Sequence, residues 1–232
     1  MRKLILTIIT WGIVVGISAQ NCNPYFPFEK GRVLKYQHFD SKGKLINSSR
    51  HTIREINQLE TATGPLLGAN VELFVTDQEG DSILTHEYQV ICKDDVLFMD
   101  VMDIIGPQLT VSFLHMDLDI KGDALIIPNK LVVGKHLPDA QTFIQGSAKG
   151  VNVLSMEFVV KQRRVEGKEQ LKIGEKAFDS FRLSYKMDVL MTIKKSFKVV
   201  QWFTKENNIG LIRTEIYNPF QRLEGYSQLV VK

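Results

Sequence analysis

The sequence predicts an all-β protein, built as a curved antiparallel sheet or half-open barrel. Apolar and polar residues alternate with a period of two through most of the chain, most cleanly over residues 181–193. Connectors rich in Gly, Asp and Asn, such as residues 40–43, 77–80, 165–168 and 207–210, separate the alternating segments and favour hairpins. No long segment of the mature chain shows the 3.6-residue period of a helix.

The segments expected to form strands are alternating runs bounded by turn residues. They are residues 32–39, 44–57, 69–76, 82–92, 96–101, 109–114, 124–127, 151–162, 169–173, 181–193, 197–204, 211–217 and 223–231. Residues 95–105 also fit one or two helical turns. Residues 117–123 start like a calcium loop, but the spacing of the ligands fails, and we interpret them as a turn with solvated carboxylates.

The longest alternating run places a large apolar surface on one side of a single strand. Thirteen residues span roughly 40 Å as a strand, and strands of this length usually bend around something. This face is a candidate surface for an apolar ligand, and the alternative is that it fills an ordinary β core. The candidate ligand-binding residues are Phe181, Leu183, Tyr185, Met187, Val189 and Met191.

Residues 1–19 have the three-part layout of a secretory signal peptide. Residues 1–3 are basic, residues 4–17 are almost wholly apolar, and Ser18 and Ala19 are small. The alternative is an uncleaved anchor helix, but the apolar stretch is shorter than the roughly 18–20 residues that span a bilayer. Cleavage would leave one β-rich domain, residues 20–232, in the periplasm or outside the cell, with no transmembrane anchor.

Cys22 and Cys92 are the only cysteines, and export would place them where thiols tend to pair. A disulfide between them would tie residues 21–29 to a strand far along the chain; the alternative is two free thiols. No Cys-x-x-Cys is present, so the bridge would be structural rather than redox-active. Gln20 and Asn21, which directly precede Cys22, are not the small or apolar residues that a lipidated cysteine requires.

The positive charge of the chain belongs in part to the leader. Removing residues 1–19 takes away Arg2 and Lys3 and no acidic residue, so the formal net charge falls from +3 to +1. Basic residues cluster at 161–164 and 194–198, on alternating segments that indicate solvated sheet faces. We therefore expect no nucleic-acid partner.

The order of strands and turns repeats weakly along the chain. Residues 20–127 and 151–232 could be two similar halves joined by the Pro- and Gly-containing stretch 128–150. A long antiparallel meander would look similar, so both interpretations stay open.

Motifs for catalysis and metal binding are missing from the sequence. There is no Gly-x-Ser-x-Gly, no His-Glu-x-x-His and no phosphate-binding loop. The histidines are scattered, at His38, His51, His86, His115 and His136, and the densest acidic group is Asp94, Asp95, Asp100 and Asp103. We assign no catalytic residue, metal ligand or cofactor.

The segment from Cys22 to Gly31, continuing to Tyr36 and residues 40–44, resembles the start of TapB-like secreted bacterial proteins. Residues 174–178, Trp202-Phe203 and residues 210–213 extend the resemblance over the mature chain. The family is largely uncharacterised, so the resemblance implies an envelope β protein and supplies no catalytic residues.

These observations together favour a non-enzymatic envelope protein. It would bind an apolar ligand such as a lipid, or a partner protein, on the concave face of its sheet. The alternatives are an envelope hydrolase whose carboxylates converge in space, and a structural or assembly factor.

Overall fold

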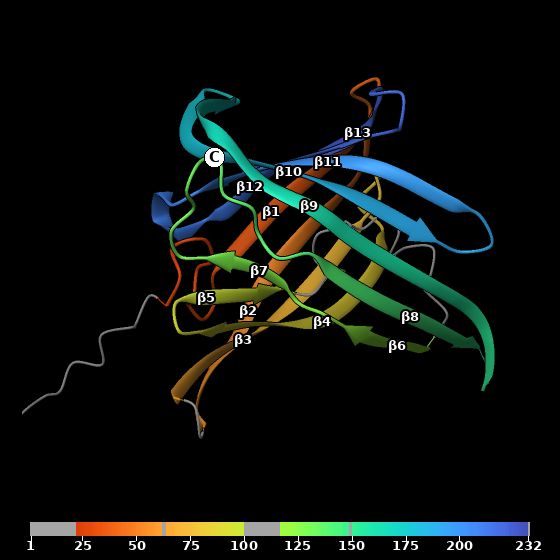
Figure 1. Ribbon diagram of the computed structural model, residues 1–232, viewed down its shortest axis with the longest axis horizontal. Helices are drawn as coiled ribbons and strands as arrows, with labels where there is room; N and C mark the ends of the chain where they lie inside the picture. Colours follow the sequence, from red (N-terminus) through yellow and green to blue (C-terminus); the bar gives the residue numbers. More distant parts are fainter. Residues whose placement is uncertain (1–21, 62–63, 100–116, 149, 232) are drawn as a thin grey trace, which may run out of the picture.

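A computed structural model describes residues 22–61, 64–99, 117–148 and 150–231 of the chain. These residues form one antiparallel sheet of 13 strands, which confirms the predicted fold class. The sheet is strongly curved, so that its strands wrap around a common interior (Figure 1). The helical content of the described residues is a short 3-10 turn, Glu206–Asn208. No helix in this part of the chain is long and apolar enough to cross a membrane.

The strands are β1 (Val33–Asp40), β2 (Leu45–Thr61), β3 (Gly64–Thr76), β4 (Ser82–Lys93), β5 (Val96–Met99), β6 (Asp117–Gly122), β7 (Leu125–Pro128), β8 (Ala140–Ala148), β9 (Val151–Ile173), β10 (Lys176–Leu190), β11 (Lys194–Thr204), β12 (Gly210–Tyr217) and β13 (Leu223–Leu229). Their order across the sheet is β6-β8-β9-β10-β11-β12-β13-β1-β2-β3-β4-β5-β7. The first and last strands of the chain are therefore neighbours in the middle of the sheet.

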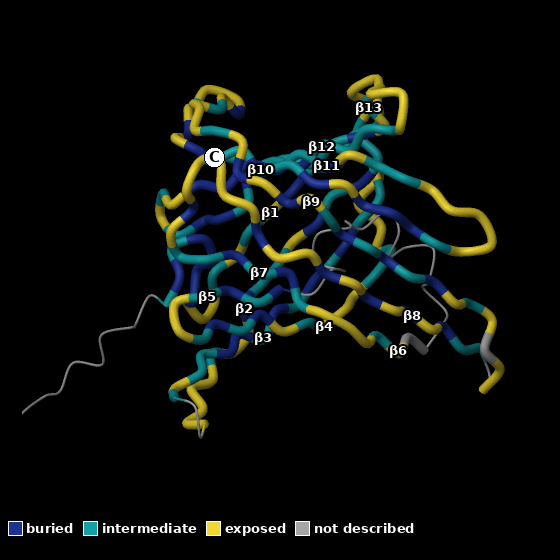
Figure 2. The backbone as a smooth tube through the Cα atoms, in the orientation of Figure 1, coloured by how far each residue is buried: buried dark blue, intermediate teal, exposed yellow. Residues whose placement is uncertain are grey.

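The alternating sequence explains which side of each strand is buried. In β10, Leu183, Tyr185 and Met187 are each at most 4% exposed, whereas Lys186 between them faces solvent. Buried residues lie along the middle of the strands, and exposed residues gather at the hairpin ends (Figure 2). The interior holds two large apolar clusters, one around Phe203 and one around Phe158.

Two turns predicted from the sequence are parts of strands. The expected turn at residues 165–168 does not exist, because β9 continues through it and pairs with β10 up to Ile173. The strand instead bends at a bulge, where Gln162 has a φ of 58°. Residues 117–122 form the edge strand β6, not a turn, because pairing with β8 satisfies their backbone.

The structure describes some of the other segments considered in the sequence analysis and leaves others outside its described residues. Residues 96–99 form β5 rather than a helical turn, and residues 109–114 lie outside the described residues. Residues 140–148, inside the stretch expected to join two halves, form β8. The proposed signal peptide also lies outside the described residues.

The two edges of the sheet come together although they do not pair. β6 and β7 end the strand order on opposite sides, yet only Asp123 and Ala124 separate them in the chain. The backbone N–H of Asp123 donates to the carbonyl of Gln141 at 2.9 Å. A Cβ at Gly122 would lie 2.2 Å from that same carbonyl oxygen, so this corner requires glycine.

The segment before β1 closes one end of the interior. A disulfide joins Cys22 to Cys92, with their Cα atoms 6.1 Å apart. The side-chain amide of Asn23 donates to the carbonyls of Asp95 and Ile127, each at 3.0 Å. These contacts hold Tyr25, which is 2% exposed, against the core.

Candidate functional site

The concave face of β10 contains five of the six residues that the sequence marks as a candidate ligand surface. Phe181 is half-buried, and the four that follow at alternate positions through Val189 are at most 5% exposed. They belong to the two interior clusters. Met191 does not share this face, because it lies in the turn after β10 and is 51% exposed.

An internal cavity of about 70 Å³ lies beside this surface, between β1–β4 and β11–β13. Its lining is mainly aromatic and aliphatic, with a few polar groups among them. The lining residues are Tyr25, Phe26, Leu34, Tyr36, His38, His51, Ile53, Val71, Tyr88, Met99, Phe203, Ile209, Leu211, Thr214 and Ser227. Among the described residues of this lining there is no Asp, Glu, Lys or Arg.

Four side chains on β1, β2 and β4 form a hydrogen-bonded chain along the cavity. Nε2 of His38 is 2.9 Å from Oγ of Ser49, which in turn is 3.2 Å from Nε2 of His51. Nδ1 of His51 is 2.9 Å from the hydroxyl of Tyr88. Since Ser49 has one hydrogen to donate, one histidine accepts from it and the other donates to it.

The strand register brings these residues together. In the β1–β2 hairpin Tyr36 pairs with Ser49, so His38 and His51 lie two positions away on either side and on the same face. The hairpin is fixed by its turn, in which Oδ1 of Asp40 accepts from the backbone N–H groups of Lys42 and Lys44.

A row of polar side chains continues from His38 across the interior face. Each member pairs directly with the next on the neighbouring strand: Asn47, His38, Ser227, Thr214 and Gln201. Four of the five are at most 6% exposed. Oδ1 of Asn47 is buried and lies within hydrogen-bonding distance of no donor among the described residues. Because an unpaired buried acceptor costs free energy, this row is a point where a ligand group or water would stabilise the interior.

Burial keeps the ionisable groups of this cavity uncharged. It lowers the pKa of His38 to about 3, with a further contribution from His51, and it lowers the pKa of His51 to about 4. Burial also raises the pKa of Tyr36 far above its ordinary value. The hydroxyl of Tyr36 donates to the carbonyl of Leu211 at 2.8 Å. At neutral pH the cavity therefore offers hydrogen bonds without charge.

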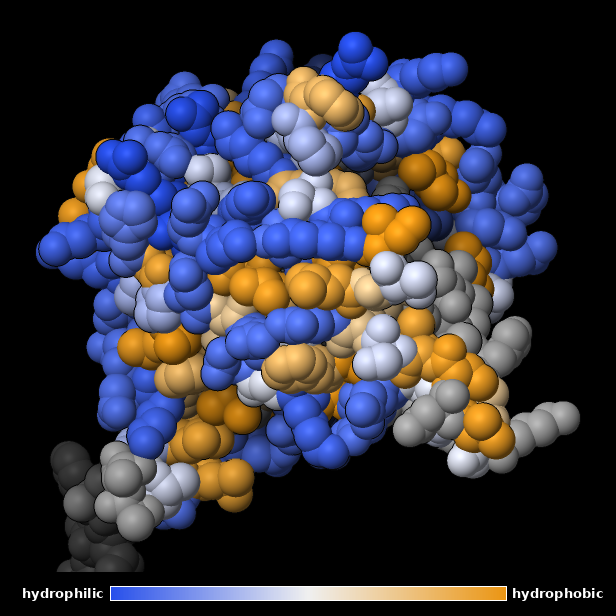
Figure 3. Space-filling model, turned by 45° about the vertical axis from the view of Figure 1, so that its right-hand side comes forward, coloured by the Kyte–Doolittle hydropathy of each residue, from blue (hydrophilic) through white to orange (hydrophobic). Residues whose placement is uncertain are grey.

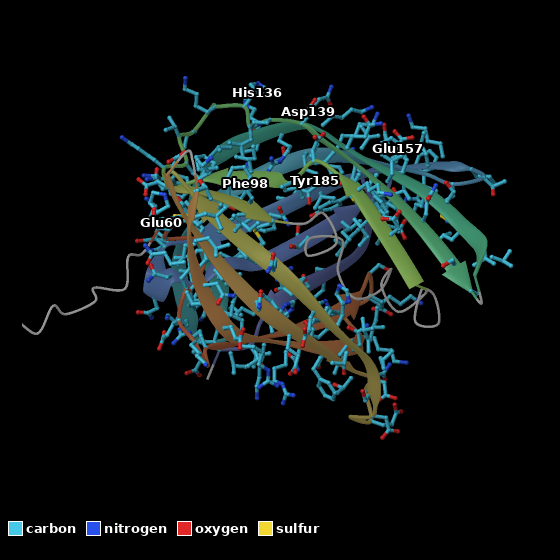
Figure 4. All side chains as sticks on the ribbon, turned by 90° about the horizontal axis from the view of Figure 1, so that it is seen from below. Glu60, Phe98, His136, Asp139, Glu157 and Tyr185 are labelled. Carbon is cyan, nitrogen blue, oxygen red and sulfur yellow. A yellow bond between two sulfur atoms is a disulfide. The ribbon has the colours of Figure 1, made fainter. Side chains whose placement is uncertain are left out.

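One buried cation lies farther along the interior, where β9 bulges. Arg163 is 3% exposed and donates to the carbonyls of Pro138 and Ile126 at 2.9 and 3.1 Å. The register places Tyr185 opposite residues 162–163. Figure 4 shows Tyr185 toward the middle of the molecule and Asp139 near its edge. By bonding β7 and the segment before β8 at once, Arg163 links β9 to the edge strand β7.

Ser49 between two histidines resembles a nucleophile beside its base, but the arrangement differs from a catalytic triad in two respects. A general base works best when its pKa lies near the operating pH, and the pKa of His51 is about 4. The side chain that orients His51 is Tyr88 rather than a carboxylate. Among the described residues no group of three His, Cys, Asp or Glu side chains could hold a metal ion.

The other side chains considered from the sequence do not join this site. Asp94 and Asp95 form the exposed turn between β4 and β5, and both have positive φ. His86 and His136 are exposed. Residues 100, 103 and 115 lie outside the described residues.

The fold and cavity define a class of protein: a wide, open antiparallel sheet wrapped around an apolar interior with an uncharged polar chain. Within that class the chain belongs to the DUF3108-like family, whose model matches residues 29–229. The resemblance to TapB-like proteins remains a prediction. No curated protein matches the sequence.

Two solved structures share the fold. A Bacteroides fragilis protein, described as exported and as having a YmcC-like fold, is 21% identical with a TM-score of 0.71. The match covers 88% of this chain and 96% of that one. A Parabacteroides distasonis protein, described as a lipoprotein, is 20% identical with a TM-score of 0.76, covering 90% of this chain and 98% of the other.

Proposed function

We propose that this protein is exported and binds an apolar ligand in its interior without transforming it. The observation that carries the proposal is the uncharged cavity, with its apolar lining and its His38–Ser49–His51–Tyr88 chain. Pockets with this combination are typical ligand sites, in which the polar groups orient the ligand.

The size of the cavity indicates how the ligand would lie. An engineered cavity of about 150 Å³ binds benzene, so 70 Å³ accommodates only the end of a larger molecule. That end would carry an uncharged hydrogen-bonding group, since none of the described lining residues carries a charge that could balance an ion. The rest of the ligand would pass the half-buried Leu34 and Leu211. A long-chain alcohol or amide has the required chemistry.

Three observations support export. The sequence predicts a signal peptide, a structural neighbour is described as exported, and Cys22 and Cys92 form a bridge that persists in oxidising compartments. The bridge also bears on whether this chain could be lipidated, as the description of the Parabacteroides distasonis protein suggests for that protein. A cysteine sulfur in a disulfide cannot carry a lipid thioether, so this chain would be released rather than anchored through Cys22.

Binding can be measured with N-phenyl-1-naphthylamine, an uncharged fluorophore that brightens in apolar surroundings. We expect the exported protein to enhance its fluorescence and a long-chain alcohol to displace it more effectively than the corresponding fatty acid. Ser227→Leu, which fills part of the cavity, should abolish the enhancement. Ser48→Leu is the matched control, because Ser48 lies on β2 beside Ser49 but faces outward.

A second variant separates loss of binding from loss of fold. Tyr88→Phe keeps the shape and removes one hydroxyl, and it should weaken displacement by the alcohol about tenfold, as expected for one hydrogen bond. Probe binding equal in Ser227→Leu and the parent protein, with both melting cooperatively, would refute the proposed site. Absence of probe binding and of co-purifying lipid in native mass spectra would refute the function.

A further inference from the structure

The hairpin between β10 and β11 ends in two exposed apolar side chains. Met191 is 51% and Ile193 is 74% exposed, and Leu190 pairs with Lys194 immediately behind them. The hairpin projects from the body of the molecule (Figure 1), and its end is exposed (Figure 2). Because backbone pairing continues to the base of the turn, the two side chains are held outward at little entropic cost.

More exposed apolar residues lie toward the same end. Val151 and Val153 lie on the same face at the start of β9, and they are 64% and 53% exposed. The start of β9 and the β10–β11 hairpin extend to the same side of the molecule in two perpendicular views (Figures 1 and 4). Apolar side chains also interrupt the hydrophilic surface where this side comes forward in Figure 3.

The hairpin is basic around its apolar tip. Residues 186–198 contain four lysines and one acid, Asp188, for a net charge of +3. Asp188 is buried and pairs with Lys161 at 2.6 Å and Lys194 at 3.1 Å. Burial alone would raise its pKa, but hydrogen bonds from Lys161, Ser196 and Lys194 keep the pKa below its usual range. The charge of the Asp188 carboxylate is thus balanced by Lys161 and Lys194. Lys195 pairs with no carboxylate among the described residues.

We propose that the β10–β11 tip docks on the surface of a lipid bilayer that contains anionic lipid. Met191 and Ile193 enter the boundary between headgroups and acyl chains, and the neighbouring lysines contact lipid phosphates. A protein partner fits less well, since specific interfaces bury about 800 Å² on each side and a narrow tip presents far less. The inference is independent of ligand binding in the cavity.

Flotation with vesicles tests the proposal. The mature protein should float with vesicles of phosphatidylcholine containing one-quarter phosphatidylglycerol, bind phosphatidylcholine alone less well, and be released by salt. Met191→Ser with Ile193→Ser should lower partitioning at least tenfold, because each side chain loses its apolar burial. Lys195→Gln with Lys198→Gln should lower it several-fold on anionic vesicles only, since both lysines are exposed and leave the ion pairs of Asp188 with Lys161 and Lys194 intact.

The matched control is Val132→Ser with Val133→Ser. These residues are 42% and 49% exposed and lie between β7 and β8, away from the hairpin. This control should bind vesicles as the parent protein does. Equal binding by the Met191/Ile193 variant and the parent, or no flotation of the parent, would overturn the proposal. Loss of a protein partner by the tip variant, without any vesicle binding by the parent, would also overturn it.

Discussion

Lowering the pH from about 7.5 to about 5 probes the two histidines of the cavity directly. Their pKa values in the folded protein, about 3 for His38 and about 4 for His51, lie below the ordinary value of 6.5. Both rings stay neutral in the folded state at pH 5, whereas in the unfolded chain both take up a proton. Acid therefore favours unfolding, and the stability that neutral histidines contribute is complete only above pH 6.5.

The size of this destabilisation follows from the difference between the pH and 6.5, the ordinary pKa of histidine. At pH 5 the unfolded chain gains about 2 kcal/mol for each histidine, so the two together remove about 4 kcal/mol of the free energy of unfolding. This is a large part of the 5–15 kcal/mol typical of a domain. The carboxyl of Asp188 does not interfere, because its depressed pKa makes its contribution fall away only below about pH 4.

Urea unfolding followed by the fluorescence of Trp202, which is 7% exposed, measures this change. Replacing His38 and His51 by Gln should flatten the dependence on pH between 7.5 and 5, whatever it does to stability at pH 7.5. His86→Gln with His136→Gln is the control, since both rings are exposed and the slope should persist. An equal slope in the His38/His51 variant and the parent would refute this account of the cavity.

Two further predictions concern the segment that closes the interior. Reducing the disulfide, which closes a loop of 70 residues, should lower the free energy of unfolding by about 4 kcal/mol, seen as a lower urea midpoint in dithiothreitol; an unchanged midpoint would contradict it. Gly210→Ala should cost about 3 kcal/mol, because the new Cβ would lie 1.8 Å from the carbonyl oxygen of Tyr25 at a φ of 80°. Gly80→Ala shares the positive φ but meets nothing within 4 Å, so it should cost about 1 kcal/mol, and equal costs would exclude the steric effect.

The sequence predicts most strands because their alternation reports burial locally. It fails where pairing overrides local chemistry. Gly167 looks like a turn residue, yet it pairs with Arg182 inside a long strand. The acidic residues of β6 resemble the start of a calcium loop and hide the alternation of Leu118 and Ile120 with them, and the segment is a strand because β8 pairs with it.

The cavity was harder to predict, because its residues come from strands far apart in the chain. Sequence spacing alone leaves His38 and His51 as scattered histidines. Only the β1–β2 register, set by the turn at Asp40, puts them on one face around Ser49. Tyr88 joins them through two further strand pairings, which no local pattern specifies.

The pairing of β1 with β13 in the middle of the sheet has a consequence for biogenesis. Until the last strand is synthesised, β1 keeps an unpaired edge and the polar row beside His38 lacks its neighbour Ser227. A chain emerging from the ribosome thus cannot complete its fold early, since the contacts it needs are the most distant in sequence and form slowly. Such delayed folding would suit the export proposed above, in which the polypeptide passes through a translocation channel before it becomes compact.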